Sequence, residues 1–461
     1  MLNKHFCNLL ILICIKECIL SSSISEFIPF YSYNPVTVRI SQYMPREVTS
    51  QVEKASRIHN SAPPTILTEL WLSRHDRALH NMLREANLQT EGMFARYGTF
   101  GIEGIEKERE IVVIQIMKVV IPCVISFQLY CETVCTACIE NGSDHVDISG
   151  EPQFLEEIQL KYNKSAKEAG LHIVGACGYD SIPAEMGIQF MESNFPGKIN
   201  SVDLYSRVRS KGGNTAINIG TLESAVLSMA EKDKIFKIRK QLFTTKLPKP
   251  KFRNEKRGAI HHNKLVNLWG VAFPLDEPVV LRTQRYKYET LGKHPIQFKG
   301  YIAAKRKLAA QSVLFGMGYI ALLASNRWTR SVLLKYPEIM TRGAFKSTGG
   351  DRDALRNMTF TSTLVGKGWE NVALQSSDHP AAPDKDIVVE VSGPDPGYAA
   401  TSLMLVSCAM TLLREKSSCT EKGGVLTPGV AFMNTNILER LQERGMKFKV
   451  VKDPTIPSKL Y

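Results

Sequence analysis

The stretch that decides the fold is HVDISGEPQFLEEIQLKYNKSAKEAGLHIVGACGYDSIPAEMG, residues 145–187. It opens with a short apolar run and continues from Phe154 with apolar residues at helical spacing and a charged outer face, up to Gly170. Glycine commonly ends helices, and a second apolar run, residues 171–174, follows it. The pattern predicts a strand, a helix and a second strand, so the two strands are expected to be parallel neighbours in one sheet.

Two polar turns follow these strands, one at residues 149–151 and one at residues 178–181. Ligands of parallel sheets bind outside the carboxyl ends of the strands, so both turns are expected to face a cleft. We interpret Asp180 and Ser181 as helix caps, whose oxygens accept from the first free amides of a helix, with catalysis as the alternative. Glu151 is interpreted in the same way, as a helix-start residue first and an acid–base residue second.

The length of 461 residues exceeds one ordinary core and predicts two domains plus an extension. The net charge is +13, and much of the excess lies at residues 232–264, with more at residues 305–307. This asymmetry favours an anionic partner, either a membrane surface or a phosphate-bearing cofactor, with a solvated basic face as the alternative. No nucleic-acid-binding module accompanies the basic residues, so nucleic acid is not an expected partner.

The ten cysteines follow no disulfide framework, which fits a reducing compartment. Cys131, Cys135 and Cys138 share one helical face at spacings i, i+4 and i+7. Such spacing could hold a metal ion, but no second ligand cluster completes a site, so we predict buried core thiols and no metal.

Two apolar segments bear on location. Residues 1–25 resemble a signal peptide that is interrupted by Lys16 and Glu17, so residues 1–30 are either a targeting segment or a leader. Residues 308–326 carry no charge and are flanked by basic residues on both sides. This segment predicts shallow attachment to a lipid surface, with a buried helix of the second domain as the alternative.

The pattern of the second half of the chain predicts an α+β domain with an open antiparallel sheet. Strands are predicted at residues 202–208, 279–280, 283–286, 357–365 and 387–391, and helices at residues 221–229, 399–414 and 437–445. The helix at residues 399–414 is predicted to be amphipathic, with Leu403, Val406, Met410 and Leu413 on one face.

Five separated motifs, in this order, resemble the saccharopine dehydrogenase family: residues 146–154, 180–184, 282–286, 393–400 and 423–429. The resemblance implies an α/β protein with a Rossmann-like, doubly wound parallel sheet that binds NADP and a second α+β domain carrying an open, mainly antiparallel sheet. The expected divisions are a leader at 1–30, the Rossmann-like domain at 31–195, the second domain at 196–395 with its apolar segment 308–326, and C-terminal helices at 396–461 that return to the first domain.

Before residue 140 the resemblance concerns the cofactor. The glycine-rich first turn of the family aligns with residues 39–45, which keep Ser41 and an aromatic Tyr43 but none of the glycines. An arginine pattern aligns at Arg74 and a later strand end at Cys123. The resemblance therefore implies Ser41, Tyr43, Arg74 and Cys123 as cofactor-binding residues.

Glycines let such a turn bring its amides close to a pyrophosphate. Here Gln42 adds side-chain bulk and Pro45 removes an amide donor, so the sequence predicts an NADP site that is weakened or lost.

The resemblance also implies a function. It is that of an NADP-dependent reductase acting on a small-molecule or lipid substrate, membrane-associated on the cytoplasmic face of a lipid droplet or mitochondrion, with links to lipid metabolism and glycolipid biosynthesis and a homodimer as a further expectation. The alternative is a non-catalytic scaffold on a lipid droplet or membrane with impaired cofactor binding. No residue pattern identifies catalytic side chains.

Overall fold

The computed structural model describes residues 119–120, 127–210, 212, 216–230, 232–274, 276–346, 350, 352–370, 379 and 381–452. The strands are β1 (Val119–Val120), β2 (Asp144–Val146), β3 (His172–Val174), β4 (Lys198–Ser210), β5 (Ile217–Asn218), β6 (Ile260–Asn263), β7 (Leu268–Ala272), β8 (Gln297–Ala304), β9 (Phe345–Lys346), β10 (Met358–Trp369), β11 (Lys385–Pro394), β12 (Gly424–Leu426) and β13 (Lys447–Lys452). The helices are α5 (Phe127–Asn141), α6 (Pro152–Ala169), α7 (Ile182–Asn194), α8 (Ile219–Ala230), α9 (Lys232–Leu242), α10 (Glu277–Leu291), α11 (Lys307–Ser325), α12 (Arg327–Lys335), α13 (Pro337–Met340), α14 (Arg352–Arg356), α15 (Thr401–Glu415), α16 (Pro428–Ala431) and α17 (Ile437–Glu443), with short helical turns η3 (Pro396–Ala400) and η4 (Lys416–Ser418).

The predicted strand–helix–strand unit is confirmed. Strands β2 and β3 are parallel neighbours, and α6 connects them. Gly170 ends α6 in the left-handed conformation at φ 68°, where it donates its amide back to the last turn. As far as the structure describes it, the sheet has the order β1-β2-β3-β12 with every pairing parallel, and β12 comes from the distant C-terminal part.

The second sheet has seven described strands in the order β13-β11-β10-β4-β8-β7-β6. All neighbours are antiparallel except β4 and β8, so this sheet is mainly antiparallel and open, as predicted. The α/β class with a parallel sheet and a second α+β part is thereby confirmed. The C-terminal segment serves both sheets, because β12 joins the parallel sheet and β13 the antiparallel one.

The strands predicted at residues 279–280 and 283–286 are wrong, because both segments lie in helix α10. Pro278 occupies the first helical turn and Gly292 ends the helix at φ 65°. The β-branched Val279 and Val280 lie in the buried face of the helix. Packing of that face outweighs the strand preference of β-branched residues.

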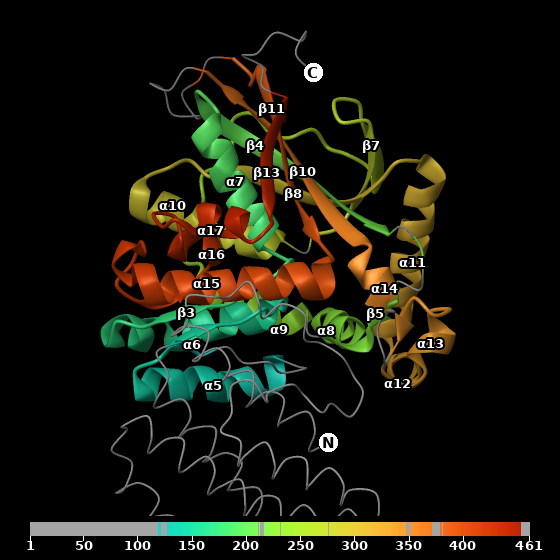
Figure 1. Cartoon of the computed structure of the whole chain (residues 1–461), viewed down its shortest axis with the longest axis horizontal. Coiled ribbons are helices and arrows are strands. Elements are labelled where there is room, and N and C mark those ends of the chain that lie inside the picture. Colours follow the sequence, from blue (N-terminus) through green and yellow to red (C-terminus); the bar gives the residue numbers. More distant parts are fainter. Residues whose placement is uncertain are drawn as a thin grey trace, which may run out of the picture. The chain divides into compact units, whose positions relative to one another are not determined.

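One continuous core joins the two sheets. It contains Val174 of β3, Met186 of α7, Leu364 of β10 and Met404 of α15, all essentially inaccessible. Helix α7 packs against β4, β10 and β11, and α15 packs against β1 and β2. Figure 1 shows α15 between β3 and the strands of the antiparallel sheet.

This position corrects the predicted face of the helix at residues 399–414. Ser407, Cys408 and Thr411 are buried together with Met410, whereas Leu413 is only half-buried. The helix is enclosed on most sides rather than amphipathic, because both sheets contribute to its surroundings. Its small hydroxyls remain compatible with burial because each donates to a backbone carbonyl one turn earlier.

Candidate functional site

The carboxyl edge of the parallel sheet is organised around Asp147, which follows β2 directly and is buried. Its Oδ1 accepts from the amide of Ser149 at 2.8 Å and from that of Ala176 at 3.4 Å. Its Oδ2 lies 2.8 Å from Nε2 of His145, and its carbonyl accepts from the amide of Cys177 at 2.7 Å. One carboxylate therefore ties the turn after β2 to the turn after β3.

Glycines at this edge are required by the packing of the chain itself. A Cβ on Gly150 would lie 2.8 Å from Oδ2 of Asp180. A Cβ on Gly175 would overlap the side chain of Leu155 in α6. These positions let the two turns and the crossover helix approach one another closely.

A third turn at the edge, residues 393–400, is closed by its own carboxylate. Asp395 accepts from the amides of Gly397, Tyr398 and Ala399 at 3.4, 2.8 and 3.2 Å, which are the first amides leading into α15. The hydroxyl of Thr401 accepts from the amide of Tyr179 at 3.1 Å. The start of α15 is thus capped from within and bonded to the turn after β3.

A chain of hydroxyls connects this edge to the antiparallel sheet. Oη of Tyr179 lies 3.1 Å from Oγ of Ser206 in β4, which lies 2.8 Å from Oγ of Ser362 in β10. The Tyr179 ring meets Phe360 edge-on at 4.9 Å between centroids. The half-buried tyrosine therefore reaches from the parallel sheet to the other sheet.

Three carboxyl groups lie around the same junction. Burial raises the pKa of Asp180 to about 6. Burial raises the pKa of Glu185 to about 7, although Thr283 donates to it at 2.6 Å. Burial, together with the charges of Asp180 and Glu185, raises the pKa of Asp276 well above its ordinary value. Carboxyls whose pKa is raised towards neutral pH can act as acids.

The predicted position at a helix start is confirmed for Glu151, whereas the predicted side-chain capping by Asp180 and Ser181 is wrong. Ser181 and Glu151 occupy cap positions, but neither side chain bonds to a helix amide. The Ser181 hydroxyl donates instead to the carbonyl of Asp180 at 2.7 Å, and Glu151 accepts from Ser224 at 2.5 Å. The Asp180 carboxylate lies next to Gly150, where an added Cβ would be 2.8 Å from its Oδ2. Tertiary contacts with neighbouring elements outweigh local capping here.

The three cysteines of α5 are buried, as predicted. Sγ of Cys135 lies 3.8 Å from Nε2 of His145, and Sγ of Cys138 lies 4.0 Å from Nδ1 of the same ring. Burial raises the pKa of Cys138 to about 12, which keeps the thiol protonated. Among the residues that the structure describes, no group of three or more His, Cys, Asp or Glu is arranged to hold a metal ion.

The family's fold implies a dinucleotide, whose pyrophosphate needs free backbone amides. The turns after β2 and β3 and the turn before α15 give such amides to Asp147 and Asp395. The amides of Ser149, Ala176, Tyr398 and Ala399 are therefore already used within the protein and are not available to a pyrophosphate. The predicted cofactor residues Ser41, Tyr43, Arg74 and Cys123 lie outside the described residues and stay a prediction.

A second candidate site is the segment at residues 305–346, here called the α11 arm, which contains α11, α12, α13 and β9. Residues Leu308, Phe315, Tyr319 and Leu322 follow one another along α11 at spacings of seven, four and three, and their exposed fractions are 77%, 76%, 44% and 69%. Such positions form one stripe on a helix. The alternative of a buried helix is therefore wrong.

The opposite side of α11 packs against the rest of the protein. Ala310 and Ala324 are buried, and the helix packs against α8, α12, β7 and β8. In Figure 1, α11 stands at the right-hand edge with α12 and α13 at its lower end. Two described helical stretches are long and apolar enough to cross a membrane, α11 and Pro396–Ser418, and most of the second is buried.

The protein is of the α/β class, with a parallel sheet joined to a larger, mainly antiparallel sheet. Comparison with known proteins then defines the family. No family model matches the chain. The chain is 32% identical over 339 residues to the human saccharopine dehydrogenase-like oxidoreductase, which covers 73% of this chain and 78% of the human protein. This chain belongs to the family of saccharopine dehydrogenase-like oxidoreductases.

Two further relatives differ in their stated locations. A lipid droplet localized protein of Caenorhabditis elegans is 32% identical over 338 residues, covering 72% of this chain and 79% of that protein. A probable mitochondrial saccharopine dehydrogenase-like oxidoreductase of Arabidopsis thaliana is 31% identical and covers 72% and 78%. Among solved structures, saccharopine dehydrogenase from Saccharomyces cerevisiae is similar with a TM-score of 0.39 and 13% identity, covering 80% and 92%.

Proposed function

We propose that this protein is an NADP-dependent oxidoreductase that works at a lipid surface and reduces a small-molecule or lipid substrate. The observation that carries the lipid part is the exposed apolar stripe of α11, since water contact of so many large apolar side chains in one row is unfavourable for a monomeric protein. The relative named for lipid droplets supports the same location. The oxidoreductase part rests on membership of the family.

A lipid flotation assay tests the location. The full chain is mixed with phosphatidylcholine vesicles, and the variant Leu308→Ser/Phe315→Ser/Leu322→Ser is compared with Leu281→Ser/Leu291→Ser. Leu281 and Leu291 of α10 are each 44% exposed, so the second variant removes exposed apolar groups outside the stripe. We expect the stripe variant to bind at least about a thousandfold more weakly, because the three inserted side chains contribute about 1.5–3 kcal/mol each. Equal loss in both variants would refute docking by α11.

The second candidate is a non-catalytic scaffold of the same fold. The observation that favours it is at the carboxyl edge of the parallel sheet, where Asp147 and Asp395 accept hydrogen bonds from turn amides that a phosphate would otherwise use. The absence of glycine from residues 39–45, which align with the glycine-rich turn of the family, points in the same direction. Under this alternative the docking remains and hydride transfer is absent.

Nicotinamide fluorescence separates the two candidates. NADPH is titrated into the full chain, with NADH and the variant Arg74→Ala as comparisons. The oxidoreductase proposal expects saturable binding of NADPH that Arg74→Ala weakens by tenfold or more, with little effect on NADH, because an arginine there would hold the 2′-phosphate. No saturable binding of either nucleotide would leave the scaffold as the function.

A further inference from the structure

The α11 arm concentrates positive charge as well as apolar surface. Residues 305–346 contain eight lysines and arginines and one glutamate, a net charge of +7 within a chain whose total is +13. Several of these cations stand beside the two ends of the apolar stripe. Lys305 and Arg306 precede α11, whereas Arg327 and Arg330 belong to the first turn of α12.

One of the arm's cations contacts the rest of the fold, because Nζ of Lys307 lies 5.7 Å from the centroid of the Trp269 ring in β7. Within the part of the chain that the structure describes, Arg306 and Arg327 make no ion pair, and both are exposed. Part of the basic segment at residues 232–264 is used in the fold, because Lys234 pairs with Glu157 at 2.6 Å and Arg239 pairs with Glu156 at 2.8 Å. The free charge of the arm is therefore available to a partner.

Trp328 and Ile339 extend the apolar surface beyond α11, with exposed fractions of 74% and 76%. Tryptophan next to arginine is typical of the membrane–water boundary. From Leu308 to Leu322 the stripe is about 21 Å long at 1.5 Å per residue. Because the opposite side of α11 packs against β7 and α8, the helix is suited to lie in the plane of an interface rather than to cross it.

We propose that the α11 arm lies flat on a phospholipid surface and selects anionic phospholipids, with its arginines and lysines on the headgroups and its stripe among the upper acyl chains. This inference rests on the proposed function and specifies the lipid. A second copy of the chain is a poorer occupant, because two arms would bring charges of +7 together. A nucleic acid would leave the apolar stripe in water.

Flotation of the full chain with two kinds of vesicle tests the selectivity. Phosphatidylcholine vesicles are compared with phosphatidylcholine–phosphatidylserine vesicles, each at low and high salt. We expect at least about tenfold tighter binding to the anionic vesicles at low salt, a preference that shrinks at high salt as screening increases. Equal binding to both vesicles would overturn the lipid selectivity while leaving the proposed lipid docking intact. Failure to bind either vesicle would overturn both.

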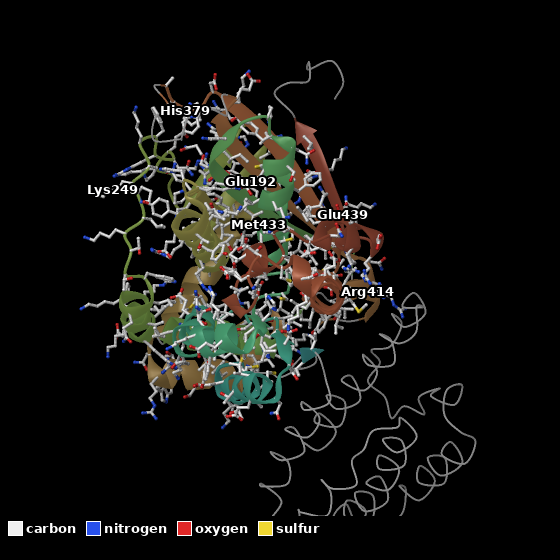
Figure 2. All side chains as sticks on the ribbon, turned by 90° about the vertical axis from the view of Figure 1, so that its left-hand side faces the viewer. Glu192, Lys249, His379, Arg414, Met433 and Glu439 are labelled. Carbon is white, nitrogen blue, oxygen red and sulfur yellow. The ribbon has the colours of Figure 1, made fainter. Side chains whose placement is uncertain are left out.

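A charge-reversal pair assigns the selectivity to the arm. Arg306→Glu/Arg327→Glu is compared with Lys249→Glu/Arg253→Glu, which changes the net charge equally on the loop after α9. Figure 2 shows Lys249 on the outer side of that loop. We expect each reversal to weaken binding to anionic vesicles alone by at least about fivefold, because loss of one basic residue costs about 1 kcal/mol and the added glutamate repels the surface.

Equal losses in the two variants would assign the preference to net charge and overturn the proposal. Folding is expected to survive in the arm variant, because both glutamates would stand at helix starts, where the dipole favours negative charge. Circular dichroism checks this. If sedimentation shows a dimer that the Leu308→Ser/Phe315→Ser/Leu322→Ser variant abolishes, and vesicle binding shows no anionic preference, the stripe belongs to a second copy and the proposal fails.

Discussion

The carboxyl edge of the parallel sheet makes its contacts within the protein, whereas the α11 arm exposes its apolar stripe to solvent. At the edge, Asp147 and Asp395 accept hydrogen bonds from the turn amides, and neighbouring side chains fill the space above Gly150 and Gly175. On the arm, the stripe of α11 faces solvent. Substitutions at the edge should therefore change folding stability, whereas substitutions on the arm should change binding.

The largest expected effect is that of Asp147→Ala. The substitution leaves the amides of Ser149 and Ala176 and the ring of His145 without their acceptor in a buried place, so we expect the free energy of unfolding to fall by about 3–5 kcal/mol. Urea denaturation measures it. Leu322→Ser on the arm is the matched comparison and should change stability by less than about 0.5 kcal/mol. Similar losses in both variants would break the comparison.

The next effect concerns pH. Because burial raises the pKa of Glu185 from 4.5 to about 7, the folded state holds this proton more tightly than the unfolded chain does. Its contribution to stability is therefore present at low pH and is lost as the pH rises from about 4.5 through 7, by about 2–3 kcal/mol.

Glu185→Gln checks this sign. A glutamine oxygen can still accept from Thr283, and the substitution removes the titrating proton, so the unfolding free energy should vary less between pH 5 and 7.5 than in the unaltered protein. Denaturation at several pH values gives both slopes. An unchanged slope in the variant would contradict the assignment to Glu185.

The smallest effects come from a matched pair of glycines. A Cβ on Gly429 would collide with the Glu185 carboxylate, so Gly429→Ala should destabilise the protein by about 1–3 kcal/mol. Nothing lies within 4 Å of a Cβ on Gly316 in α11, so Gly316→Ala should stabilise it by up to about 1 kcal/mol through helix propensity. Thermal unfolding measures the stability of both variants. A change of the same sign in both would contradict the opposite effects expected here.

The sequence predicted the parts of the fold that local pattern controls. The run from His145 to Val174 carries its own strand, helix and stop signals, and the parallel unit formed as expected. Helix α10 was missed because Val279 and Val280 prefer strands locally, while burial of one helical face decides their structure. Such burial depends on distant elements that a single sequence does not place.

The site was less predictable. The roles of Asp180 and Ser181 follow from contacts with Gly150 and with the neighbouring backbone, and local capping rules pointed elsewhere. Asp147 and Glu185 were missed; Asp147 was placed inside a strand predicted at residues 145–148, whereas β2 ends at Val146, and Tyr179 was placed in a cleft-facing turn without a role of its own. For α11, the uncharged run predicted the helix, but only the packing of Ala310 and Ala324 shows which face is free.

Hydrogen–deuterium exchange of the full chain with and without phosphatidylcholine–phosphatidylserine vesicles shows which residues contact lipid. We expect vesicles to slow exchange in peptides covering residues 305–346 and to leave peptides covering residues 145–187 unchanged. Slowed exchange at residues 145–187 with no change along the arm would contradict this expectation.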